Sequence, residues 1–105
     1  MSKSKTRVSL QAKLEELLGT RHVYYQPPES LKLVYPCFVY YLADIDVQHA
    51  DNRAYILKHR YTVTYMDKNP DTDMKERMLL EFPQCDFDRP YTVNGLHHFV
   101  FDLIY

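Results

Sequence analysis

The sequence predicts an α+β domain: a mostly antiparallel four-stranded sheet, a long projecting hairpin, and two helices packed on one face. Two helical stripes and four strand-like stretches follow in the order helix, strand, strand, strand, helix, strand. Helices that stay outside a run of strands pack beside an antiparallel sheet, which gives this class. The 105 residues are enough for one domain, assigned to residues 1–105 with a flexible tail over 1–5.

The first helix is predicted over residues 6–18. Its apolar residues recur at helical spacing on one face: Leu10, Leu14, Leu17 and Leu18. Thr6 or Ser4 can cap its start, and Gly19 is suited to the left-handed position after its end. This amphipathic stripe indicates that the helix lies on an apolar surface.

The second helix is predicted to begin near 71–73 and to run to about Phe82. Met74, Met78 and Phe82 share one of its faces, and Pro83 ends it. Asp73 and Glu76 have the spacing of a capping box.

Strands are predicted at residues 22–26, 36–48, 53–66 and 97–105. In the second, one face has Cys37, Val39, Tyr41, Ala43, Ile45 and Val47, and the other begins with Phe38, Tyr40 and Leu42. In the third, Tyr61, Val63 and Tyr65 alternate with Thr62 and Thr64, as in a half-buried strand. Residues 84–96 are expected to be irregular, with a turn at Asn94-Gly95.

The two central strands form a hairpin that is longer than a compact body of this size. Twelve residues at ~3.3 Å each span ~40 Å, whereas the radius of gyration expected for about 100 residues is ~13 Å. The hairpin tip, residues 43–54, should therefore project. Ile45 and Val47 would be exposed there unless a loop folds over them, so the tip is the candidate partner interface. Its residues are Asp44, Ile45, Asp46, Val47, Gln48, His49, Asp51, Asn52 and Arg53.

Composition excludes several kinds of function. Two glycines are too few for a dinucleotide fingerprint or a P-loop, and no Gly-x-Ser-x-Gly elbow occurs. The net charge of -1 gives no basic field for binding nucleic acid. Cys37 and Cys85 stand far apart, which favours two reduced, buried thiols, although one bridge stays open. No apolar run reaches the ~20 residues of a membrane span.

No catalytic or metal-binding pattern emerges either. The segment at 67–73 begins like a calcium loop, but Thr72 and Met78 stand where that loop needs Gly and Glu. Two Asp-x-Asp pairs lack a nearby nucleophile, and no two of the five histidines have His-x-x-x-His spacing. We therefore expect no enzyme, no cofactor and no metal.

Charge is distributed unevenly along the chain. Residues 1–25 have five basic and two acidic groups, whereas residues 67–88 have three basic and seven acidic groups. A protomer with a basic and an acidic end can associate head to tail, and such contacts can close into rings. Asp67, Asp71 and Asp73 are therefore the candidate subunit interface.

Several stretches resemble tail terminator (tail completion, head-tail joining) proteins of long-tailed bacteriophages. They run in order over nearly the whole chain: LEELLG at 14–19, VYYQPPE at 23–29, YPCFVY at 35–40, ADNRAY at 50–55, RYTVT at 60–64, DKNPD at 67–71 and CDFDRPYT at 85–92. No single stretch is a mechanistic signature, so the weight lies in the ensemble.

This resemblance implies a structural protein of the virion, made in the host cytoplasm. About six copies would form a homo-hexameric ring that caps the tail tube, ends its polymerisation and joins the head connector. The implied partners are other copies of the chain, the major tail tube protein and the head-tail connector or stopper, with no membrane; DNA would pass through the channel without specific binding.

Two alternatives remain open. The first is a head-side neck or connector protein, an adaptor or stopper. The second is a small non-viral regulatory binding domain of the same architecture that acts as a dimer.

Overall fold

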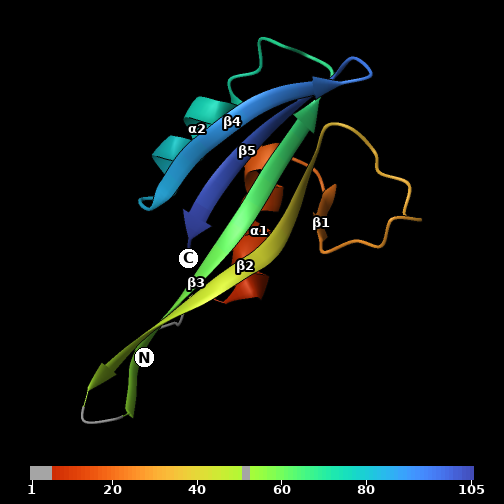
Figure 1. Cartoon of the computed structure of the whole chain (residues 1–105). Helices are drawn as coiled ribbons and strands as arrows, with labels where there is room; N and C mark the ends of the chain where they lie inside the picture. The colour runs from red at the N-terminus through yellow and green to blue at the C-terminus, as the bar shows by residue number, and fades with distance from the viewer. Residues whose placement is uncertain (1–5, 51–52) are drawn as a thin grey trace.

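The computed structural model describes residues 6–50 and 53–105 (Figure 1). In chain order, the elements are α1 (Arg7–Leu18), β1 (Val23–Tyr25), β2 (Cys37–Ala50), β3 (Arg53–Asp67), α2 (Met74–Glu81), β4 (Cys85–Val93) and β5 (Leu96–Ile104). They form one mixed sheet in the order β1-β2-β3-β5-β4, in which β1 is parallel to β2 and the other pairs are antiparallel. The α+β class is as predicted.

The prediction of four strands was wrong by one. Residues 84–96, expected to be irregular, contain β4 and the turn that leads into β5, with Asn94 and Gly95 at positive φ. β4 includes Asp86, Asp88 and Pro90, which are poor strand formers, and a register shift lies between Phe87 and Arg89. Its pairing with β5 stabilises this edge strand. Because that stability comes from a long-range contact, the sequence of β4 shows no clear alternating pattern.

Helix α1 is confirmed with both of its end signals. The Thr6 side chain accepts a hydrogen bond from the Ser9 amide, the Ser9 hydroxyl accepts one from the Thr6 amide, and Gly19 is left-handed. Helix α2 begins at Met74, just after the start predicted near 71–73. The capping box expected there was wrong, because the Asp73 side chain makes no capping hydrogen bond.

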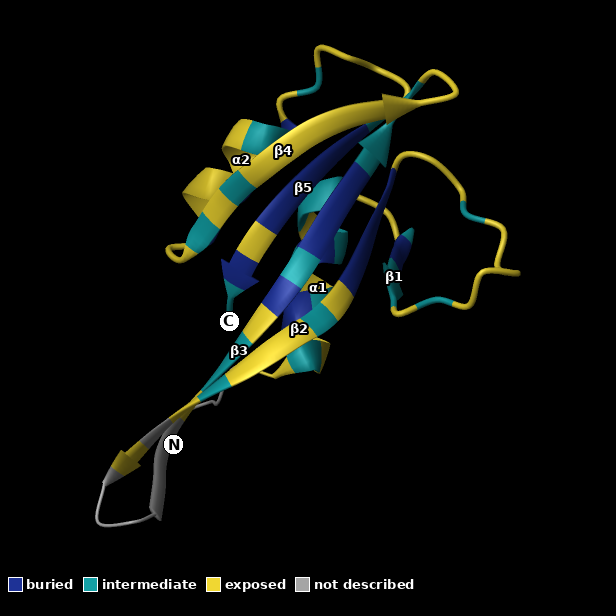
Figure 2. Ribbon diagram, in the orientation of Figure 1, coloured by how far each residue is buried: buried dark blue, intermediate teal, exposed yellow. Residues whose placement is uncertain are grey.

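Both helices cover the same face of the sheet and share one core (Figure 2). The helices contribute Leu10, Leu14, Met74 and Met78, and Phe82 follows α2. The sheet contributes Phe38, Tyr40, Tyr61, Val63, Tyr65, Phe99, Phe101 and Leu103. The predicted inward face of β3 at 61, 63 and 65 is therefore confirmed.

Part of the high tyrosine content is explained by this core. The Tyr40 ring is fully buried, yet its hydroxyl donates to Gln11 Oε1 at 2.6 Å and accepts from Arg7 at 3.2 Å. Gln11 also donates to the Val23 carbonyl, so the same group joins α1 to β1. A tyrosine here fills apolar volume and still satisfies its polar tip.

We predict that Leu14→Ala lowers the free energy of unfolding by about 2–5 kcal/mol, because it leaves a cavity at a side chain with 0% exposure. The matched control is Leu80→Ala, at a side chain with 87% exposure, which should change it by no more than about 0.5 kcal/mol. Urea denaturation of both variants measures the difference. Equal effects would contradict the placement of α1 against the sheet.

Candidate functional site

Strands β2 and β3 continue past the body as a two-stranded ribbon, here called the arm: residues 43–50 and 53–59 (Figure 1). On one side, β1 pairs only with Phe38, Val39 and Tyr40 of β2. On the other, β5 ends at Ile104, opposite Arg60. The described molecule extends over 52 × 31 × 27 Å, with a radius of gyration of 15.0 Å, above the ~13 Å of a compact domain.

A β-bulge lies where the arm leaves the body. Leu42 is opposite Tyr61 and Asp44 is opposite Arg60, so Ala43 is an extra residue on β2. One extra residue reverses the alternation of all side chains that follow it. The prediction that Ile45 and Val47 share a face with Cys37 and Val39 is therefore wrong. Both residues lie on the helix-covered face. The prediction failed because it assumed an unbroken period of two.

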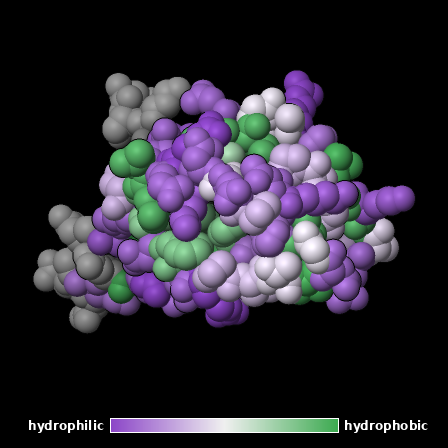
Figure 3. Space-filling model, turned by 90° about the horizontal axis from the view of Figure 1, so that it is seen from above, coloured by the Kyte–Doolittle hydropathy of each residue, from purple (hydrophilic) through white to green (hydrophobic). Residues whose placement is uncertain are grey.

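The reversal carries the apolar face of the sheet out along the arm. Ile45 is opposite His59 and Val47 is opposite Leu57, all on the face that forms the core further up. Ile45 and Val47 are each 42% exposed and Leu57 is 56% exposed, so no described segment folds back over them. At the end of the body that lies away from the arm tip, seen from above, hydrophobic groups lie among hydrophilic ones (Figure 3).

The opposite face of the arm is charged. Asp44 and Asp46 of β2 lie opposite Arg60 and Lys58 of β3. Arg60 forms an ion pair with Asp46 at 3.2 Å, with both side chains almost half exposed, so the pair contributes about 0.2–1 kcal/mol. The arm thus has one apolar face and one face with acidic and basic rows.

The remaining predicted partner residues are only partly placed. Gln48 pairs with Ile56 and His49 with Ala54, with a register shift between the two pairs, and His49 is exposed. Arg53 is the first residue of β3. Asp51 and Asn52 lie outside the described residues.

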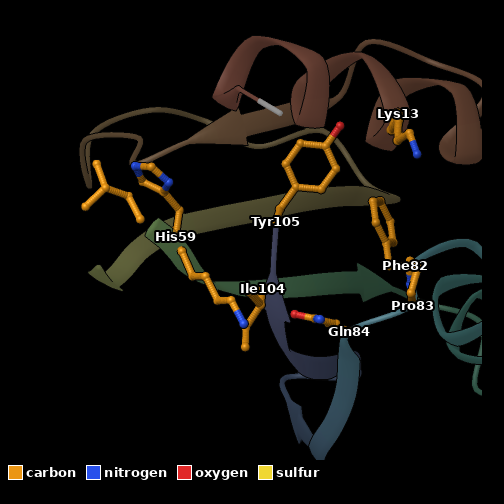
Figure 4. A pocket seen from close by; sticks show the side chains of 9 residues that line it. Lys13, His59, Phe82, Pro83, Gln84, Ile104 and Tyr105 are labelled. Carbon is orange, nitrogen blue, oxygen red and sulfur yellow. The ribbon is translucent and has the colours of Figure 1, made fainter. Parts of the chain in front are cut away.

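A pocket at the base of the arm was missed by the sequence reasoning (Figure 4). It has a volume of about 520 Å³ and is lined by Lys13, Leu57, Lys58, His59, Phe82, Pro83, Gln84, Ile104 and Tyr105. These residues come from α1, β3, the segment after α2 and the end of β5. No local pattern could have revealed it, because it forms only when these distant elements meet.

One wall of the pocket is fixed by interlocking contacts. The Tyr105 hydroxyl lies 2.7 Å from Ser9 Oγ, and the Tyr105 ring meets the Phe82 ring edge-on at 6.0 Å. The Lys13 ammonium lies over both rings, at 5.6 and 5.9 Å, and 3.6 Å from Glu81. Two lining residues, Lys13 and Lys58, are cationic and none is acidic, and Lys58 has no ion pair among the described residues, whereas Lys13 is paired with Glu81. The pocket is therefore suited to apolar and negatively charged groups.

The three predicted subunit-interface aspartates are in different settings. Asp67 is engaged within the chain, where it accepts hydrogen bonds from the Tyr65 hydroxyl at 2.6 Å and the Asn69 amide at 3.0 Å. Burial and this contact raise the pKa of Tyr65. Asp71 and Asp73 are exposed and available to another molecule. Within residues 6–50 and 53–105, no cluster of His, Cys, Asp and Glu could hold a metal ion.

The two thiols are free and poorly reactive. Burial raises the pKa of Cys37 to about 12; burial, then Asp86 and Asp102, raises that of Cys85 to about 11. A thiol must lose its proton to act as a nucleophile. Cys37 is fully buried, as predicted, and Cys85 is half-buried.

A scan against models of protein families finds no match, and a search of curated proteins finds none either. None of the described helices is both long and apolar enough to cross a membrane.

We predict that both thiols resist alkylation in the folded protein. Relative to a thiol of pKa 9.0, the thiolate fraction at pH 8 falls about 1000-fold for Cys37 and about 100-fold for Cys85. Raising the pH should speed alkylation, first at Cys85. Unfolding in urea should expose both thiols to the reagent. Mass spectrometry after timed iodoacetamide treatment measures this. Fast modification of folded Cys37 would contradict its burial.

Proposed function

We propose that this chain is a structural protein of the bacteriophage neck. In this proposal, copies of it form a ring that caps the tail tube, ends tail polymerisation and joins the tail to the head connector. The observation that carries the proposal is the arm, a projecting ribbon with exposed apolar side chains at Ile45, Val47 and Leu57. A protein that acts by contact needs such a surface.

The resemblance supports the same function. The similar stretches lie at the end of α1, on β1 and the loop after it, at the start of β2, at the arm ends of β2 and β3, on β3 within the body, in the acidic segment 67–71 and on β4.

The size of the body is compatible with a ring around DNA. Six equal bodies side by side leave a central opening about as wide as one body. With the two shorter dimensions of 31 and 27 Å, that opening admits a DNA duplex. The net charge of -1 suits a channel through which DNA passes without being held.

Contacts between copies would use the sheet edges, the helices and the acidic segment 67–73. Asp71 and Asp73 are exposed there and available to a basic patch on a neighbouring copy. The arm is then left to reach the adjoining ring. Its residues 44–49 and 53 are the proposed contacts.

The experiment is electron microscopy of lysates from a phage that lacks this gene. We expect overlong tails, unattached to filled heads, because nothing would stop the tube from growing. Normal-length free tails beside emptied heads would favour a head-side connector instead. Intact particles would contradict any neck function and favour the regulatory binding domain.

A shortened variant tests the role of the arm separately from that of the body. Replacing residues 43–54 with a tight turn should leave a folded protein and tails of normal length that no longer join heads. Circular dichroism and thermal unfolding verify the fold, and particle counts measure joining. Native joining by this variant would contradict the role of the arm.

A further inference from the structure

The edges of the sheet are not equally protected against pairing with another strand. β1 is only three residues long. The outer strand β4 has Asp88, Arg89 and Pro90 along it and an irregular register, which are devices that block strand addition. By contrast, β3 has four apolar residues in succession over 54–57 and no proline on the arm.

The side of β3 turned away from β2 is unpaired along the arm in the part of the chain that the structure describes. The Tyr105 amide donates to the His59 carbonyl, which shows that His59 points its backbone groups toward β5. Because these directions alternate along an antiparallel strand, the N–H and C=O of Leu57 point the same way. No strand lies there, since β5 ends at Ile104.

A bulge limits this unpaired edge toward the tip of the arm. Between the pairs Gln48 with Ile56 and His49 with Ala54, β3 has one residue more than β2, which is Tyr55. A bulge disfavours strand addition, so the free edge is the regular stretch around Leu57, whose unpaired ladder groups are a template for an incoming strand.

The pocket lies at the end of this edge, in line with β5 (Figure 4). A strand that continued the line of β5 along β3 would pass directly beside it. Its side chains would alternate between the helix-covered face, where Leu57, Phe82 and Tyr105 line the pocket, and the outer face, where Lys58 and Ile104 line it. The first side is apolar. On the second side, Arg60 is paired with Asp46, and Lys58 is the cation beside the free edge.

We propose that the pocket and the free edge of β3 together bind an extended segment with alternating apolar and acidic residues, contributed by the head-side connector protein. The segment adds to β3 as an antiparallel strand, with its apolar side chains toward Leu57, Phe82 and Tyr105 and its acidic side chains toward Lys58. This inference rests on the proposed function, in which the arm serves joining.

The dimensions favour a segment from another protein over a second arm of the same ring. Bodies 27–31 Å wide set the spacing of neighbouring arms. An arm of two strands is only about 10 Å wide, so a gap of roughly 20 Å separates neighbours, enough for about three further strands. Two neighbouring arms of such a ring would therefore not touch, and a segment from another protein has room to enter between them.

The first test fuses a six-residue extension that alternates Glu and Val, beginning with Glu, after Tyr105. In line with β5, this extension offers its own strand to the free edge at high effective concentration. The control extension has proline in place of each valine and cannot donate those hydrogen bonds. We expect the Leu57 amide to exchange with solvent at least tenfold more slowly in the Glu-Val chain than in the control. Equal exchange would overturn the strand site, whatever the protein does.

In the second test, each of the two extended chains is expressed in place of the native protein in a phage that lacks the gene. The chain with the Glu-Val extension, which occupies the strand site itself, should give tails of normal length without heads. The chain with the proline extension should give joined particles. Joined particles from the Glu-Val chain, with Leu57 protected, would overturn the connector segment as its occupant. Overlong tails from the Glu-Val chain alone would overturn it in favour of the tail tube protein. Failure of the proposed function would appear separately, as intact particles without the gene.

Discussion

The antiparallel pairing of β2 with β3 is the constraint on which the rest of the molecule depends. One ladder, from Cys37 opposite Met66 to Ala50 opposite Arg53, builds both the centre of the sheet and the whole arm. Its upper part is covered by two helices, and the rings of Phe38 and Tyr65 lie 5.1 Å apart there. Its lower part has no cover among the described residues. The same strands are thus a core element at one end and a surface at the other.

The bulge at Ala43 decides what that surface presents. Without it, Ile45 and Val47 would lie beyond Val39 on the outer face, and the aspartates would extend the helix-covered face. With it, the apolar side of the sheet continues past the helices, and Asp46 meets Arg60 on the other side. The ion pair is too exposed to add much stability. Its value lies in register, because an opposite charge across the ladder disfavours a slip by one residue.

The sequence predicted features that depend on neighbours along the chain and missed those that depend on distant contacts. The stripe from Leu10 to Leu18, the cap at Thr6 and the alternation of β3 all act locally, and all were found. Strand β4 was missed because it is stabilised by its partner β5 rather than by a local pattern. The bulge was missed because an alternating sequence does not show where an extra residue interrupts the pairing. The pocket was missed for the same reason. The candidate partner residues at 44–49 were placed on the arm, but on faces opposite to those expected.

An uncovered ribbon has an energetic consequence for assembly. Two strands without a covering layer are marginally stable in water, because ordering costs about 1–2 kcal/mol per residue and little apolar area is buried in return. A third strand on β3 would satisfy the ladder groups of Leu57 and bury its side chain, which is 56% exposed in the isolated chain. The contact would then supply the free energy of folding that the isolated arm lacks. In the proposed function, the arm would be only marginally stable until a partner strand binds, and its ordering would be coupled to the step that joins two assemblies.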